Sequence, residues 1–252
     1  MPIHTATVFL LRKISFRNTS YIVDVLTRNR GRVSLIAKGA RREKSGFFGR
    51  LDYCSKLEIV YIDKKEAMGV LTECDIIDYF PEIHRSRRRL GCSMLFARLI
   101  REFVEAQEAG CDLFDLCSSF FSDMHSCDEK EIITIYLKSV LVLLDLTGFR
   151  PDVTSCAVCG VKTEDAAPLI FNTEESEMVC RTCLSEKKEK KYLELSLKSC
   201  IIIKALQAME HADDINSSEQ DIWPVERFLL EFASSILHKD LRQLSLRLYD
   251  VE

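Results

Sequence analysis

The sequence predicts an α+β protein of several domains, in which a five-stranded β-barrel precedes an α-helical domain that contains a four-cysteine, zinc-ribbon-like insert. Three observations lead to this fold class. Short segments rich in branched and aromatic residues fill the first 80 residues, helical spacing of apolar residues follows Pro81, and two Cys-x-x-Cys pairs interrupt the helical region. The expected domains are residues 1–80 and 81–252, with the insert at 152–186.

Five strands are expected in the N-terminal region, separated by polar turns such as Asn18-Thr19-Ser20 and the tip Asp63-Lys64-Lys65-Glu66. Five short strands in about 80 residues suit a small closed barrel, and the oligonucleotide-binding (OB) fold is the leading candidate. The strands are expected at Val8–Phe16, Tyr21–Leu26, Val33–Ala37, Leu57–Ile62 and Met68–Ile77.

The helical region begins after Pro81. The helix expected at Glu129–Leu146 is apolar on nearly every face, so it should be central in a bundle, and Gly148 should end it. Asp112 is expected to cap the helix before it, and Pro224 to lie in the first turn of the last helix. The other helices are expected at Glu82–Ala109, Leu113–Met124, Leu197–Met209 and Val225–Leu237.

The bulk composition is that of an ordinary globular protein, with 47% hydrophobic and 29% charged residues among 252. No apolar run reaches ~18 residues, and the N-terminus lacks the pattern of a signal peptide. We therefore expect a cytosolic protein that does not associate with membranes. Seven scattered cysteines are expected to be small buried hydrophobes without disulfides: Cys54, Cys74, Cys92, Cys111, Cys117, Cys127 and Cys200.

The cysteine pairs Cys156/Cys159 and Cys180/Cys183 have the spacing of a tetrahedral zinc site. Four protein ligands leave no open coordination position, so one Zn²⁺ would hold the fold rather than activate water. Redox pairs or incidental thiols are the alternative, although neither pair lies between a strand and a helix as a thioredoxin-like motif would. A zinc deaminase is disfavoured because the sequence contains no His-x-Glu.

Charge is distributed unevenly along the chain. The segment from Arg12 to Lys56 contains 12 basic and 3 acidic residues, a net charge of +9, whereas the whole chain carries −4. Such asymmetry suggests a surface for a polyanion, and solvated surface charge is the alternative. The candidate DNA-binding residues are Arg30, Arg32, Lys38, Arg41, Arg42, Lys44 and Arg50, most of them on a loop between the third and fourth strands.

Two further features could extend this surface. Phe47 and Phe48 could stack on bases, or they could fold back and plug the mouth of the barrel. Arg85-Ser86-Arg87-Arg88-Arg89 forms a second basic cluster at a helix start, which could contact DNA or be a solvated face.

Catalytic signatures are missing. The sequence has no phosphate-binding Gly-x-x-x-x-Gly-Lys-Ser/Thr loop, no Gly-x-Ser-x-Gly elbow and no Gly-x-Gly-x-x-Gly, and its five histidines are dispersed. We therefore expect a binding protein without enzymatic activity.

The order of these parts resembles the RecO family of bacterial recombination-repair proteins over essentially the whole chain. The resemblance is based on Leu26-Thr27 with Gly31, on Lys38-Gly39-Ala40-Arg41-Arg42 with Ser45, and on Gly148-Phe149-Arg150-Pro151 shortly before the first cysteine pair. The sequence departs from the family at Asn18-Thr19-Ser20, where a Gly-Glu pair often precedes the second strand.

The resemblance implies a recombination mediator in DNA repair. Such a protein would bind single- and double-stranded DNA, anneal complementary strands, associate with RecR and the single-strand binding protein, and help to load RecA. It would act in the bacterial cytoplasm at the nucleoid. The alternative is a non-catalytic adaptor whose zinc ribbon and barrel bind a protein partner rather than DNA.

Overall fold

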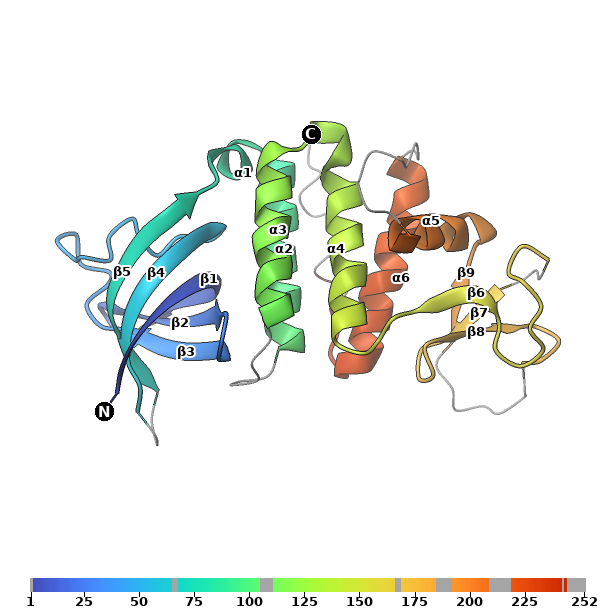
Figure 1. Cartoon of the computed structure of the whole chain (residues 1–252), viewed down its shortest axis with the longest axis horizontal. Helices are drawn as coiled ribbons and strands as arrows, with labels where there is room; N and C mark the ends of the chain where they lie inside the picture. Colours follow the sequence, from blue (N-terminus) through green and yellow to red (C-terminus); the bar gives the residue numbers. More distant parts are fainter. Residues whose placement is uncertain are drawn as a thin grey trace. The chain divides into compact units, whose positions relative to one another are not determined.

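The computed structural model describes residues 2–64, 68–104, 111–165, 169–184, 192–208, 219–241 and 243. The chain forms two compact units, Met1–Cys127 and Asp128–Glu252. The first unit contains five strands and the first three helices, and the second contains the remaining helices and a smaller sheet (Figure 1). The two units are defined by compactness and do not test the domain boundary expected after residue 80, which stays a prediction.

The predicted five-stranded N-terminal sheet is confirmed. The strands follow the order β1-β2-β3-β5-β4, and β1 pairs with both β2 and β4, so the sheet closes into a barrel. Part of the expected polar tip after Asp63, residues 65–67, lies outside the described residues. The strands are β1 Ile3–Phe16, β2 Ser20–Thr27, β3 Gly31–Ala37, β4 Ser55–Ile62 and β5 Gly69–Tyr79.

The closure of the barrel depends on a short parallel pairing between β3 and β5. It comprises three residue pairs, beginning with Leu35 opposite Gly69. A Cβ atom at Gly69 would lie 2.8 Å from Leu35 Cδ2 and 3.0 Å from the carbonyl oxygen of Ile62. Glycine at position 69 therefore permits the close approach of strands at the seam.

Side chains alternate between the inside and the outside of the barrel, as the period of a strand requires. Val8, Val25 and Leu57 belong to the inner core. Phe9 points the other way and contacts Phe114 and Phe121 of a helix, with ring centroids 5.1 and 5.2 Å apart. The outer face of β1 is thus covered by helices.

Three helices complete the first unit: α1 Pro81–Arg85, α2 Arg87–Phe103 and α3 Cys111–Ser126. The prediction of one helix from Glu82 to Ala109 was wrong, because Ser86 is extended (φ −110°, ψ 125°) and its side chain accepts a hydrogen bond from the backbone N–H of Arg89. Residues 105–110, the expected end of that helix, lie outside the described residues. Asp112 lies inside the first turn of α3 and does not precede the helix.

The second unit contains η1 Glu129–Glu131, α4 Ile132–Leu146, α5 Leu197–Ala208 and α6 Glu219–Leu237. Helix α4 is buried on most sides, as its sequence predicted. Gly148 (φ +83°) follows it; its N–H bonds to Asp145 O and the Phe149 N–H to Leu144 O, the Schellman pattern that ends a helix. The placement of Pro224 in a first turn was wrong, since α6 begins five residues earlier.

The sheet of the second unit has the order β6-β8-β7-β9. Its strands are β6 Asp152–Cys156, β7 Leu169–Asn172, β8 Glu177–Cys180 and β9 Tyr192–Leu195, so it extends beyond the expected insert at 152–186. Phe171 of β7 contacts Phe228 and Phe232 of α6 edge to face, which attaches the sheet to the helices. Among the described residues, no helix has both the length and the apolar character needed to span a membrane.

Candidate metal centre and nucleic-acid surface

Two parallel strands bring the cysteine pairs together. Strands β6 and β8 are parallel neighbours, and they end at Cys156 and Cys180 respectively. The carboxyl ends of parallel strands lie at the same edge of a sheet, so the turns that follow, each ending in the second cysteine of its pair, lie next to each other. The N–H of Ala157 bonds to Met178 O at 2.9 Å and fixes this register.

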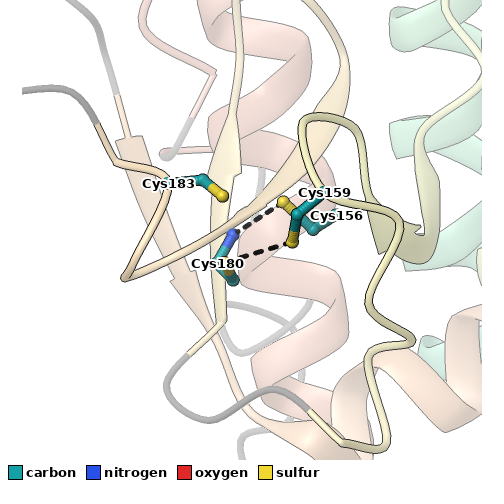
Figure 2. Close-up of side chains that lie close together, drawn as sticks. All are labelled: Cys156, Cys159, Cys180 and Cys183. Atoms are coloured by element: carbon teal, nitrogen blue, oxygen red, sulfur yellow. Dashed lines mark hydrogen bonds between the residues drawn. The ribbon is translucent and has the colours of Figure 1, made fainter.

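The four sulfur atoms have the spacing of a metal site (Figure 2). All of them lie within 4.8 Å of one another, and the sulfurs of Cys159 and Cys180 are 3.8 Å apart. Four sulfurs at ~2.3 Å from one tetrahedral ion would be separated by ~3.8 Å. The predicted grouping of Cys156, Cys159, Cys180 and Cys183 is therefore present, and the cluster could bind one metal ion with no ligand position left open.

Hydrogen bonds favour thiolates at two of these cysteines. Burial alone would raise the pKa of Cys156, but backbone N–H groups, beginning with that of Cys180 at 3.3 Å, lower this pKa overall. The hydroxyl of Thr182 and the N–H of Cys183 lower the pKa of Cys180 to about 6. The side chains of Cys180 and Cys159 raise the pKa of Cys183 to about 12, so without a cation the cluster retains protons that a metal would displace.

Five of the candidate DNA-binding cations lie on the loop between β3 and β4, and four of these have no carboxylate partner among the described residues. Lys38, Arg41, Arg42 and Lys44 all lie between β3 and β4, and their side chains are exposed. The backbone N–H of Arg41 bonds to Thr19 O at 2.9 Å, which attaches the loop to the β1–β2 turn. Among the residues that the structure describes, none of the four forms an ion pair with a carboxylate. We call these four residues the basic loop.

Arg41 also donates to the carbonyl oxygen of Arg17 at 3.3 Å, and the other three candidates have protein partners as well. Arg30 forms an ion pair with Asp63 at 2.8 Å and bonds to the Tyr61 hydroxyl, which raises the pKa of Arg30. Arg50 pairs with Asp75 at 2.6 Å. Arg32 donates to the carbonyl oxygen of Arg101 on α2.

The remaining basic cluster is divided between surface and interior. Arg87 is exposed and Arg85 pairs with Glu82, whereas Arg89 is only 8% exposed. Arg89 donates to the carbonyl oxygens of Met124 and Cys127 at the end of α3. Part of this cluster therefore holds two helices together.

A lysine that the sequence analysis did not single out connects the barrel to the loop between β3 and β4. Lys13 Nζ donates to Leu51 O at 2.6 Å and lies over the rings of Tyr21 and Tyr53. Burial lowers the pKa of Lys13, although the charge of Asp52 opposes the shift. A register shift between Leu10 and Arg12 turns Lys13 toward Val23 of the core, so strand alternation read from sequence could not have found it.

Comparisons with known proteins agree with this arrangement. The family model described as "Recombination protein O N terminal" matches residues 1–80, and "Recombination protein O C terminal" matches residues 84–245. A protein of Syntrophus aciditrophicus named DNA repair protein RecO is 26% identical over 96% of this chain and 93% of its own length. A namesake from Rhodopirellula baltica is 33% identical over 69% of this chain and 64% of its own, and one from Syntrophobacter fumaroxidans is 24% identical over 89% of both. The chain therefore belongs to the RecO family of DNA repair and recombination proteins.

Proposed function

We propose that this protein is a non-enzymatic recombination mediator that binds single- and double-stranded DNA and anneals complementary strands. In this proposal it acts with RecR to help load RecA onto DNA coated with single-strand binding protein, in the bacterial cytoplasm at the nucleoid. Membership of the RecO family supports the proposal. The five-stranded closed order of the N-terminal sheet supports its assignment as an OB fold, which commonly binds oligonucleotides.

The proposal of DNA binding rests mainly on the basic loop. Its four exposed cations are available to phosphates, because no described carboxylate neutralises them. Each phosphate contact releases condensed counterions, so affinity for single-stranded DNA should fall by roughly 0.7 log unit per log unit of salt for each contact. Arg30 and Arg50 would first have to leave their carboxylate partners, so we propose a smaller contribution from them.

We propose that the four-cysteine cluster binds one structural Zn²⁺. Thiolate sulfur is a preferred zinc ligand, and the sulfur separations suit tetrahedral coordination. A bound ion would connect the turn after β6 to the turn after β8 and would stabilise the small sheet. No step of DNA annealing is assigned to it.

A salt titration with a variant tests DNA binding. Fluorescence anisotropy of a labelled single-stranded oligonucleotide should show steep salt dependence for the wild type and almost none for the variant in which all four residues of the basic loop are replaced by glutamate. In a control variant, glutamate replaces four exposed cations outside the loop: Arg87, Lys130, Lys162 and Lys239. This variant has the same net charge as the basic-loop variant. Its affinity should fall much less.

Two results would contradict the proposal. Equal affinity of the wild type and the basic-loop variant would make the loop a solvated surface and would favour the protein-binding adaptor. If both variants lost the same affinity for the oligonucleotide, the effect would come from net charge and not from the position of the basic loop. Strand annealing should also proceed without a nucleotide cofactor, and a requirement for nucleotide hydrolysis by this chain would exclude the non-enzymatic mechanism.

A further inference from the structure

Two adjacent phenylalanines of the loop between β3 and β4 have opposite environments. Phe47 is partly buried and packs against the barrel core together with Ala40 and Leu51. Phe48 is 66% exposed, one of the most exposed large apolar side chains in the described part of the protein. The inward packing that was the alternative for both rings therefore applies to Phe47, whereas Phe48 is exposed.

A series of turns relates Phe48 to the cations of the loop. The backbone N–H of Phe48 bonds to Ser45 O, that of Ser45 to Arg42 O and that of Arg42 to Gly39 O, each at 2.9 to 3.0 Å. These bonds link three successive turns that lead from Gly39 through Arg42 to Phe48. The exposed ring of Phe48 therefore lies on the same short loop as the exposed guanidinium of Arg42.

The loop is held in place before any ligand binds. Ala40 and Leu51, near its two ends, are 4% and 5% exposed, and Lys13 Nζ donates to the Leu51 carbonyl oxygen. The loop is therefore partly ordered in the free protein, so a ligand that stacks on Phe48 causes a smaller loss of conformational entropy when it binds. The surrounding positive charge selects an anionic ligand that also offers a flat apolar face, and a nucleotide with an unpaired base has both properties.

We propose that Phe48 stacks on an unpaired base of single-stranded DNA while the basic loop contacts phosphates, so that Phe48 favours single strands over duplex. This inference rests on the proposed DNA-binding function. In a duplex the bases already stack on each other and are not available to a side chain, whereas the phosphates remain accessible. Phe48 should therefore add affinity for single-stranded DNA alone, whereas the cations should add affinity for both single-stranded and duplex DNA.

The test replaces Phe48 by alanine, leucine and tyrosine. Phe48→Ala should weaken binding to a single-stranded thymidine oligonucleotide on the order of tenfold, because aromatic stacking on a base contributes that much in single-strand binders. Duplex affinity and the salt slope should not change, since no phosphate contact is lost. Phe48→Tyr should retain affinity, and Phe48→Leu, which keeps an apolar side chain without a π face, should lose nearly as much as alanine.

An oligonucleotide of the same length with abasic sites completes a double-mutant cycle. Wild type and Phe48→Ala should bind it equally, because the stacking partner is absent. Ile201→Ala removes another exposed apolar side chain, from α5, and should leave all affinities unchanged. Thermal unfolding should show that each variant is folded.

The outcomes separate this inference from the proposed function. Salt-dependent binding by the wild type, with equal affinity of Phe48→Ala, would overturn the stacking role and leave DNA binding intact. If Phe48→Leu kept full affinity for single-stranded DNA, an apolar contact would be enough and stacking would be overturned. Such a contact is what a protein partner would also make. A loss in Phe48→Ala that persists on the abasic strand would indicate an altered loop and would also overturn it. Absence of DNA binding by the wild type would overturn both proposals.

Discussion

Arg101 Nε of α2 donates a 2.8 Å hydrogen bond to Oδ2 of Asp24 on β2, 77 residues earlier in the chain. Ser34 Oγ donates to the other carboxylate oxygen at 2.6 Å, and Arg12 lies 3.8 Å away. The Asp24 side chain is only 7% exposed. This carboxylate therefore attaches a helix to the outer face of the barrel.

Replacement of Asp24 by asparagine should destabilise the protein by about 2 kcal/mol near neutral pH, because Arg101 loses its charge-assisted bond to Asp24 and keeps only its pair with Glu102. Burial raises the pKa of Asp24, but the bonds from Ser34 and Arg101 and the charges of Arg101 and Arg12 lower it overall. The stabilisation should thus be present above the unfolded pKa of ~3.9 and disappear as the pH falls through the lower folded pKa.

Urea unfolding at several pH values measures this effect. The matched control is Asp115→Asn, which breaks the pair with Arg28, where both side chains are about half exposed. It should cost less than ~1 kcal/mol. An Asp24→Asn protein as stable as the wild type at pH 7 would show that the contact adds nothing to stability.

Arg89→Leu should cost about 2 to 4 kcal/mol of stability, because it removes the donors that serve the carbonyl oxygens of Met124 and Cys127. The last carbonyls of a helix have no intrahelical partner, so they depend on such donors. Arg87→Leu, at an exposed position of the same helix, should change stability by less than ~0.5 kcal/mol. Equal unfolding midpoints for the two variants would contradict this structural role of Arg89.

Metal analysis of protein purified without chelator should find one zinc per chain. Cys156→Ser should abolish zinc binding and lower the temperature of thermal unfolding, since binding contributes on the order of 10 kcal/mol to folding in small zinc modules. Cys111→Ser, at an exposed cysteine outside the cluster, should keep both zinc and stability. A metal-free wild type with unchanged thermal stability would refute the assignment.

Alkylation should distinguish the cysteines outside the cluster. Burial raises the pKa of Cys54 to about 12 and that of Cys200 to about 11, so the reactive thiolate is scarce at pH 8. The expectation of burial was wrong for Cys111, which is exposed, and iodoacetamide should label it at least about tenfold faster, as followed by peptide mass spectrometry. In urea the rates should converge. Labelling of Cys54 as fast as Cys111 in the native protein would disagree with its burial.

Much of the fold was accessible from the sequence because its signals are local. Branched and aromatic residues between turn residues predicted the five N-terminal strands, and the apolar faces of α4 predicted that this helix is buried. The same local signals failed at Pro224, which usually begins a helix but here lies inside α6, and at Ser86, which divides the helix expected from Glu82. Strand β9 was missed because it is short and pairs only through tertiary contacts.

The sequence by itself determined the kinds of ligand that this protein can attract: four thiols at metal spacing and an excess of cations in one short segment. Only the tertiary structure decided which of those groups are free. Arg30 and Arg50 are neutralised by carboxylates 33 and 25 residues away, and Phe47 turns inward where Phe48 turns outward. Charge and spacing are properties of the chain, whereas pairing and exposure depend on which distant residues folding brings within a few ångströms.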